Sequence, residues 1–260
     1  MSIANLRSLA NPRVPISELN LNMLLGGPIL ALPCQEGAGA TVYDISGFGN
    51  DGAFRGAGEP AWAQLASGLW TLSFDGSNDY VSTPAITTPT ELTIMFWIIF
   101  NSFPASQYEN IIGNRDTGND GDFMIYRVQD ALKLRPTIYT APSGYSSHDS
   151  DAIVIDTPYH IAMTWKRPNL RSYINGVEDT ASPTVIDEPS TSATRLWRIG
   201  LDEYNKPPPD ALISLIGACP RALSDTEVLN HCNREKHLLG ILDGNILARL
   251  ANLRSLAAVR

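Results

Sequence analysis

The stretch "ELTIMFWIIF", which spans Glu91 to Phe100, is apolar at almost every position. Because successive side chains of a β-strand point to opposite faces of a sheet, its residues divide into two sets. One face carries Leu92, Ile94, Phe96, Ile98 and Phe100, and the other carries Met95, Trp97 and Ile99. A strand that is apolar on both faces is covered on both. We therefore predict a central strand whose second face lies under a neighbouring segment or loop.

Short strand-like runs follow this stretch, and each is bounded by Gly, Pro, Asn, Asp or Ser. They are "FMIYRV" (123–128), "LKLRPTIYT" (132–140), "AIVID" (152–156), "YHIAMTWK" (159–166), "LRSYINGV" (170–177), "RLWRIG" (195–200) and "ALISLIGAC" (211–219). The pair Asn175-Gly176 is a strong signal of a β-hairpin. Strands at this spacing without helices between them predict an all-β, two-sheet antiparallel sandwich of the jelly-roll kind. We expect Trp97 and Trp165 to be buried between its sheets.

A helix interrupts the β pattern at "LSDTEVLNHCNREKHLLG" (223–240). Ser224 and Glu227 have the S-x-x-E spacing of a capping box, which satisfies backbone N–H groups at the start of a helix. Gly240 suits the end of a helix, where a left-handed backbone is common. We predict a short C-terminal helix over 225–238.

Five blocks of the sequence resemble the concanavalin A-like, laminin-G-like jelly-roll family. They are "ATVYDISGFGNDG" (40–52), "LSFDGSNDYVSTP" (72–84), "LTIMFWI" (92–98), "YHIAMTWKRPNLRSYINGV" (159–177) and "IGACPRALSDTEV" (216–228). The resemblance implies two curved antiparallel sheets packed face to face, in a domain over 28–236. Residues 9–39 are also similar to the segment that leads into the domain in laminin-G-like proteins of tailed bacteriophages and prophages. Because this family includes sugar-binding, protein-binding and hydrolytic members, the fold alone does not give the function.

The heptapeptide "ANLRSLA" occurs twice, at 4–10 and at 251–257. Both copies lie in helix-prone segments outside the β region, an N-terminal arm and connector (1–27) and a C-terminal helical arm (239–260). Residues 1–16 carry two arginines and no acidic residue, and residues 238–260 carry three arginines and one aspartate, although the net charge of the chain is −8. The candidate docking residues of these two basic arms are Leu6, Arg7, Leu9, Leu250, Leu253, Arg254 and Leu256. Chance recurrence or an old recombination remains the alternative explanation.

The sequence offers no convincing catalytic residues, so we expect a protein that is not an enzyme. Retaining glycosidases need two carboxylates about 5–5.5 Å apart, and members of this fold usually carry them as Glu-x-Asp-x-x-Glu, which is absent here. The nearest acidic clusters are Asp116, Asp120 and Asp122, and Asp149 with Asp151. Both lie between predicted strands, where Asp, Asn and Gly form turns.

No cofactor or metal site is predicted, although a structural calcium ion stays open as an alternative at two places. "DTGNDGD" (116–122) spaces oxygen ligands at alternate residues but lacks the ligands of an EF-hand loop. Asp44, Asn50 and Asp75 form a second possible oxygen cluster, for which turn formation is the preferred explanation. The four histidines, at 148, 160, 231 and 237, are not expected to assemble.

The composition of the chain excludes some kinds of binding partner. A net charge of −8 argues against nucleic acid, and the sequence has no apolar run long enough to span a membrane. The three cysteines, Cys34, Cys219 and Cys232, have no zinc spacing and are expected to be reduced core thiols. Four tyrosines near predicted loops could form a sugar-stacking surface, namely Tyr108, Tyr139, Tyr145 and Tyr204.

The sequence leads to two hypotheses for the function. The first is a non-enzymatic virion structural protein, a capsid decoration or fibre component that docks through its terminal arms. Its partners would be other copies of the chain in a homo-oligomer, or a repeating protein shell such as a capsid. It would be located in the virion after synthesis in the host cytoplasm. The alternative is a carbohydrate-binding, lectin-like module for cell-surface glycans.

Overall fold

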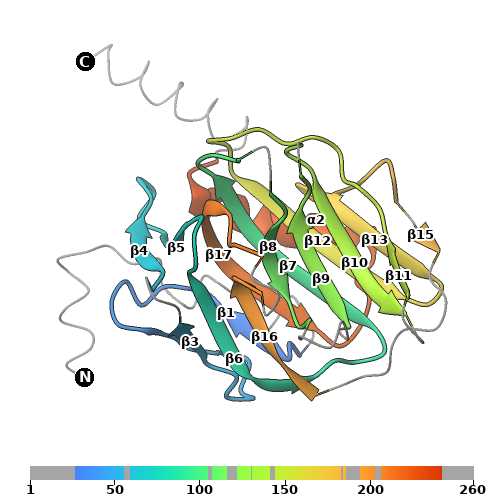
Figure 1. Cartoon of the computed structure of the whole chain (residues 1–260), viewed down its shortest axis with the longest axis horizontal. Coiled ribbons are helices and arrows are strands. Elements are labelled where there is room, and N and C mark those ends of the chain that lie inside the picture. Colours follow the sequence, from blue (N-terminus) through green and yellow to red (C-terminus); the bar gives the residue numbers. More distant parts are fainter. Residues whose placement is uncertain are drawn as a thin grey trace, which may run out of the picture.

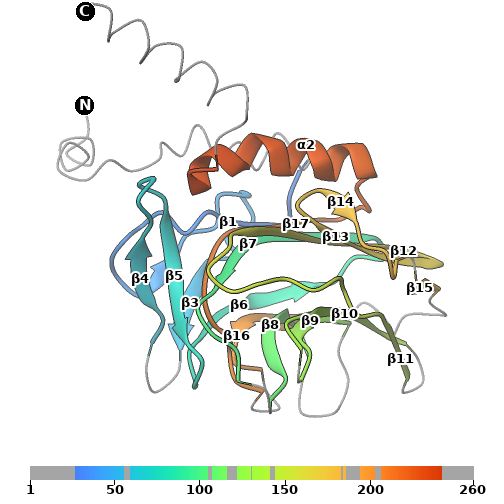
Figure 2. The same ribbon diagram turned by 90° about the horizontal axis from the view of Figure 1, so that it is seen from above.

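The computed structural model describes residues 27–55, 59–104, 107–115, 122–129, 131–140, 144–182, 184–185, 194–202 and 206–241. These residues form two antiparallel β-sheets packed face to face, with a helix across the outer face of one sheet (Figures 1 and 2). The predicted two-sheet sandwich with a short C-terminal helix is therefore confirmed. The terminal arms, and with them every candidate docking residue, lie outside the described residues.

The sheet beneath the helix has nine strands. Its main path runs β14 (Val177–Glu178), β13 (Asn169–Ile174), β12 (Tyr159–Lys166), β7 (Leu92–Phe100), β17 (Asp210–Cys219), β5 (Trp70–Asp75) and β4 (Ala61–Gln64). Two further strands pair off this path: β1 (Leu30–Leu32) with β17, and β15 (Thr184–Val185) with β13. The central position of β7 confirms the expectation drawn from its two apolar faces.

The opposite sheet has eight strands. Their order is β11 (Gly144–Ser147), β10 (Leu134–Thr140), β9 (Phe123–Arg127), β8 (Glu109–Gly113), β16 (Thr194–Gly200), β6 (Tyr80–Thr87), β3 (Gly52–Arg55) and β2 (Thr41–Val42). The predicted run 152–156 is not a strand. Val154 and Ile155 are exposed, while Ile153 is buried, so this run lacks the continuous buried face that would hold it in a sheet.

The main core fills the space between the sheets. All five residues of one face of β7 belong to it, together with Trp165 of β12 and Trp197 of β16. Trp97 is also buried, but on the other face of β7, where it packs with Leu215 and with Cys232 of the helix. The prediction that Trp97 lies between the sheets is therefore wrong: its position in the alternation of β7 turns it toward the helix.

Helix α2 (Asp225–Glu235) starts at Ser224, and the capping box with Glu227 is complete. A short 3₁₀ segment, η4 (Lys236–Leu239), continues it and ends at Gly240, whose φ of 79° is left-handed. Asn175 and Gly176 join β13 to β14 with φ of 54° and 80°, as a two-residue hairpin turn requires. The predicted helix and hairpin are both confirmed.

The three cysteines are free and buried, as predicted. Among the described residues, no helix is long and apolar enough to cross a membrane.

Candidate functional site

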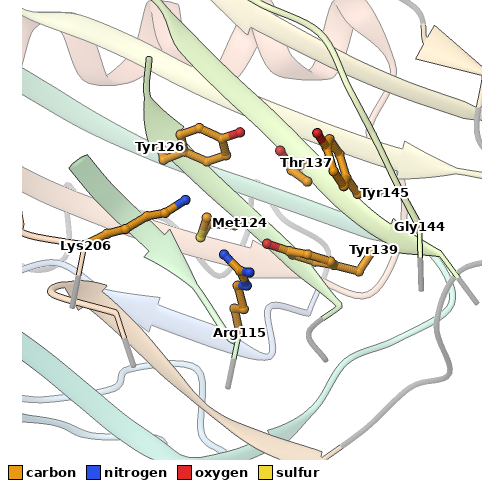
Figure 3. A pocket seen from close by; sticks show the side chains of 8 residues that line it. All are labelled: Arg115, Met124, Tyr126, Thr137, Tyr139, Gly144, Tyr145 and Lys206. Carbon is orange, nitrogen blue, oxygen red and sulfur yellow. The ribbon is translucent and has the colours of Figure 1, made fainter. Parts of the chain in front are cut away.

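A pocket opens on the outward face of the eight-stranded sheet, on the side away from α2 (Figure 3). Its volume is about 320 Å³. Strands β9, β10 and β11 supply most of the lining, and two loop residues, one after β8 and one before β17, complete it. The lining residues of this tyrosine pocket are Arg115, Met124, Tyr126, Thr137, Tyr139, Gly144, Tyr145 and Lys206.

Strand alternation explains how these side chains reach the pocket. In β9, Phe123 and Ile125 lie in the main core, so the residues that alternate with them point outward. In β10, Ile138 lies in the core, so its two neighbours point outward. The antiparallel register sets Thr137 opposite Met124, and cross-strand pairs of this kind lie next to one another on one face. The pocket is thus a direct result of the register of β9, β10 and β11.

Four tyrosines form the aromatic part of the site, three in the lining and Tyr108 behind them. Tyr108 and Tyr126 meet edge to face, with ring centroids 5.6 Å apart, and those of Tyr139 and Tyr145 are 6.5 Å apart. Tyr126 and Tyr139 are buried, whereas Tyr145 is 62% exposed. The buried rings fix the shape of the pocket, and Tyr145 presents a ring that a ligand can reach.

Positive charge lies against these rings. The Lys206 ammonium is 4.6 Å from the Tyr126 ring centroid and 5.3 Å from that of Tyr108. The Arg115 guanidinium is 5.5 Å from the Tyr139 ring centroid. In Figure 3 the side chains of Lys206, Arg115 and Tyr139 all point toward the centre of the pocket. Cations held over aromatic faces gain electrostatic stabilisation, and here they give the pocket a positive character.

Burial and neighbouring charges, Arg115 and Asp202 among them, shift two pKa values in the pocket. Burial, followed by the charge of Arg115, lowers the pKa of Lys206. Burial raises the pKa of Tyr139 to about 12, so this phenol is neutral at physiological pH. An anionic group in the pocket would relieve the repulsion between the two cations and favour the charged form of Lys206.

One polar atom of the pocket wall has no hydrogen-bond partner among the described residues. The Thr137 hydroxyl oxygen, Oγ1, is buried between the outward side chains of β9 and β11. A buried hydroxyl without a partner is costly, and ligands or ordered water usually satisfy such groups. This hydroxyl is an unpaired polar group in the wall of the pocket.

The sequence indicated part of this site. Three of the four tyrosines considered as a possible sugar-stacking surface, Tyr108, Tyr139 and Tyr145, belong to it, while Tyr204 lies outside the described residues. The six other lining residues were not expected from the sequence: Arg115, Met124, Tyr126, Thr137, Gly144 and Lys206. The alternation of side chains in the runs 123–128 and 132–140 could have indicated Tyr126 and Thr137. No local pattern marks the two cations in loops, Arg115 and Lys206.

The candidate calcium cluster is not assembled as an ion site in the described residues. The Asp44 carboxylate accepts hydrogen bonds from the backbone N–H groups of Ala31, Ser46 and Asn50. The Asn50 amide donates to the carbonyl of residue 29, and the Asp75 carboxylate accepts from the backbone of residue 77. Such contacts are typical of turns, and turn formation was the preferred explanation for these three residues.

The acidic clusters weighed for catalysis have structural contacts where they are described. Asp149 forms an ion pair with Arg135, which lowers the pKa of the carboxyl. Asp151 accepts a hydrogen bond from the hydroxyl of residue 180, at 2.7 Å. Asp122 accepts one from the amide of residue 114, at 2.8 Å. Asp116 and Asp120 lie outside the described residues.

The expectation that the histidines stay apart is wrong for one pair. The ring centroids of His160 on β12 and His231 on α2 are 5.6 Å apart. The helix lies across the sheet and brings together two residues that the sequence separates widely (Figure 2).

Residues 75–229 match the Concanavalin A-like lectin/glucanases superfamily, and the chain belongs to that superfamily. The family prediction is thus confirmed for the β region. The likeness of residues 9–39 to bacteriophage proteins stays a prediction. None of the curated proteins matches the sequence.

Several solved structures share the fold. The receptor-binding domain of botulinum neurotoxin type G is similar with a TM-score of 0.61 and 17% identity, over 80% of this chain and 51% of that chain. Botulinum neurotoxin type C, whose cell entry is dependent upon interaction with two ganglioside molecules, is similar with a TM-score of 0.63 and 15% identity, over 82% of this chain and 52% of that chain.

Trypanosoma rangeli sialidase in complex with 2,3-difluoro-KDN has a TM-score of 0.62 and 13% identity, over 82% of this chain and 33% of that chain. The chain therefore spans about half the length of the toxin structures and a third of the sialidase. At these identities the likeness shows a shared fold and no more.

Proposed function

We propose that the chain is a non-catalytic carbohydrate-binding module, and that it binds an acidic saccharide in the tyrosine pocket. The observation that carries this proposal is the gathering of tyrosine rings with Lys206 and Arg115 in and around a 320 Å³ pocket. The pocket lies on a chain of net charge −8, so the local positive charge runs against the overall composition.

The chemistry of a sugar ring fits this lining. A pyranose has apolar C–H faces that can pack on an exposed aromatic ring, as Tyr145 offers, and hydroxyl groups that need polar partners such as Thr137. A carboxylate or sulfate on the sugar would form charge-assisted hydrogen bonds with Lys206 or Arg115, which are stronger than neutral ones. The two cations therefore favour an acidic sugar over a neutral one.

The structural relatives support the proposal at the level of ligand class. Botulinum neurotoxin type C interacts with ganglioside molecules, and Trypanosoma rangeli sialidase forms a complex with 2,3-difluorosialic acid. Binding of these ligands is a property of the toxin and of the sialidase. That this chain binds a ligand of the same class, an acidic saccharide, is part of the proposal.

The lining also supports a non-catalytic role. Among the pocket-lining residues that the structure describes, none is an Asp or a Glu. Hydrolysis of a glycosidic bond ordinarily needs two carboxyl groups that flank it. Tyrosines, two cations and a threonine can hold a sugar but do not supply that pair.

Binding can be tested with a glycan array followed by calorimetry on the full chain. We expect selective signals for glycans that carry a carboxylate or sulfate, weaker binding at high salt, and no release of free sugar. Tyr145→Ala should weaken binding about 10-fold, a free-energy change of about 1.4 kcal/mol. Tyr43→Ala is the matched control, because Tyr43 is similarly exposed, at 58%, and does not line the pocket.

Two results would contradict the proposal. One is an array without acidic glycans among its signals. The other is a loss of binding in Tyr43→Ala as large as the loss in Tyr145→Ala, because the two tyrosines differ in their place relative to the pocket.

A second candidate role concerns the arms, and the repeated heptapeptide favours it. We propose that "ANLRSLA" at each end docks the chain on equivalent grooves of a repeating partner, which makes the chain a component of a virion, as capsid decoration or fibre. Basic arms beside an acidic body support a docking role, because two weak contacts on one body gain avidity. A glycan-binding body and docking arms are compatible in one protein.

The arms can be tested without removing any segment. Leu6→Ala with Leu9→Ala, and Leu253→Ala with Leu256→Ala, should each weaken self-association or particle attachment, and the four changes together should abolish it. The measurements are analytical ultracentrifugation and co-sedimentation with particles. Unchanged assembly in the fourfold variant would contradict the docking role and leave glycan binding untouched.

A further inference from the structure

A compact cluster of two histidines and one glutamate lies between the nine-stranded sheet and α2, away from the tyrosine pocket. His160 projects from the outer face of β12, where it pairs in register with Trp97 of β7. His231 and Glu235 are four residues apart on α2, so they lie on the same face of the helix. The ligand atoms of the three side chains all lie within 4.8 Å of one another.

The cluster is closed to solvent. His160 is 0%, His231 1% and Glu235 2% exposed. The helical segment above it is tethered at both ends. The Tyr173 hydroxyl donates to Asp225 at the start of α2, at 2.9 Å, and the hydroxyl of residue 67 donates to the carbonyl of residue 238 in η4, at 2.6 Å. The site is therefore a fixed, preformed arrangement rather than a surface grouping.

Several polar atoms of the cluster have no hydrogen-bond partner among the described residues. They are both ring nitrogens of His160, both ring nitrogens of His231, and Oε1 of Glu235. The other oxygen, Oε2, accepts a hydrogen bond from the Trp97 indole at 2.7 Å. It also lies 3.2 Å from Nδ1 of His231, without the alignment of a hydrogen bond. So many unpaired polar atoms in one enclosed place indicate a missing partner.

An ion pair between His231 and Glu235 does not account for the cluster. It would leave both nitrogens of His160 unpaired in an apolar setting. His160 therefore needs a partner other than Glu235, and an imidazole ring nitrogen can bind a metal ion directly.

We propose that His160, His231 and Glu235 bind a transition-metal ion, best suited to Zn²⁺, which fastens α2 to the sheet. Imidazole nitrogen and carboxylate oxygen are usual zinc ligands, with bonds of about 2.0–2.2 Å. In a tetrahedron with such bonds the ligand atoms are about 3.4 Å apart. The ligand atoms of the three side chains, all within 4.8 Å of one another, are close enough to converge on one ion.

The Trp97 indole gives the site a supporting contact. Its hydrogen bond to Oε2 orients the Glu235 carboxylate and leaves Oε1 for the metal ion. Such contacts behind a metal ligand fix its orientation. Because all three ligands are buried, a substrate could not reach the ion, and its role is structural; a water molecule would be its fourth ligand.

The test uses the untagged full chain. Protein refolded with excess Zn²⁺ and then gel-filtered should contain about one zinc per chain by mass spectrometry of the metal. Protein refolded with Co²⁺ should show the visible absorption bands of a tetrahedral site. The melting temperature should be higher with Zn²⁺ than with EDTA. A metal content near zero, together with equal melting temperatures, would overturn the proposal in favour of buried water.

Variants locate the ion. His160→Gln and His231→Gln should each weaken zinc binding at least 10-fold and remove the cobalt bands. His237→Gln is the matched control, because His237 lies on the exposed side of the same helical segment. This variant should change neither the zinc affinity nor the cobalt bands. Should a glutamine variant fail to fold, the wild-type metal content and the melting temperatures still decide the question. Full metal binding in either of these two variants, once folded, would overturn the proposal.

Discussion

The outer faces of the two sheets differ in what covers them. On the nine-stranded sheet, Met95, Trp97 and Leu215 point outward and are buried, because α2 and η4 lie over this face (Figure 2). On the eight-stranded sheet, Tyr126 and Tyr139 occupy equivalent outward positions, and no helix of the described residues lies above them. One face is therefore a second core, and the other is an open surface with aromatic rings and positive charge.

Because of this difference, we assign the stability of the fold mainly to the helix-covered face and ligand binding to the open face. The helix-covered face contains the contacts that join distant parts of the chain, such as the Trp97–Glu235 hydrogen bond. In the described part of the chain, the open face has only a small cluster of buried hydrophobic residues, Met124, Tyr126 and Tyr139, and its exposed ring, Tyr145, is available to a ligand. Substitutions on the first face should change the free energy of unfolding, and substitutions on the second should change affinity.

The strongest effect should arise on the covered face. Trp97→Ala should lower the free energy of unfolding by about 3–5 kcal/mol, because it opens a cavity and removes the hydrogen bond to Glu235. Urea denaturation followed by circular dichroism measures this loss of unfolding free energy. Tyr145→Ala on the open face is the control and should cost less than about 0.5 kcal/mol. Similar losses for both variants would remove the distinction between the faces.

On the open face, Lys206→Gln should weaken binding of an acidic saccharide by about 1.5–3 kcal/mol, the range of a hydrogen bond to a charged group. Isothermal titration calorimetry measures this change. The free energy of unfolding should barely change, since burial already disfavours the Lys206 charge. If the variant bound acidic and neutral saccharides as the wild type does, the cation would have no part in recognition.

A more modest effect is expected at the start of α2. Ser224→Ala removes the hydroxyl that accepts the Glu227 backbone N–H, and loss of such a cap costs about 1 kcal/mol. Chemical denaturation should show this decrease while saccharide affinity stays unchanged. A change in affinity would mean that the covered face communicates with the pocket.

The weakest effect concerns the pH dependence of the same cap. The hydrogen bond from Arg221, followed by the backbone of Ser224, lowers the pKa of Glu227 to about 2. Because the folded-state pKa lies below the unfolded value, the stabilisation is complete above about pH 4.5 and is lost as the pH falls toward 2. The effect is small because the carboxylate is partly exposed and screened.

Comparison of wild type with Glu227→Gln in urea, from about pH 6 to about pH 2.5, measures this contribution. The difference in unfolding free energy should shrink as the pH falls. A difference that stays constant over this range would show that the carboxylate charge contributes nothing.

Local patterns predicted much of the fold. The two apolar faces of β7, the capping box at Ser224 and the Asn175-Gly176 turn all depend on residues close together in the sequence, and all three are confirmed. The strand at 152–156 was predicted wrongly, because only Ile153 of its apolar residues is buried while Val154 and Ile155 are exposed. Three tyrosines near predicted loops, Tyr108, Tyr139 and Tyr145, were considered as a possible sugar-stacking surface, and they do belong to the site.

Short-range patterns in the chain are enough to tell which segments form strands, where the helix begins and ends, and which side of each strand is apolar. These properties follow from side-chain alternation, capping and turn geometry, which act over a few residues. Long-range packing settled which face of β7 and β12 the helix α2 covers, so that Trp97 lies under the helix rather than between the sheets and His160 lies beside His231. It also placed Arg115 and Lys206 beside the tyrosines. Such contacts join segments far apart in the chain, and they depend on how the sheets and helix pack rather than on any local pattern.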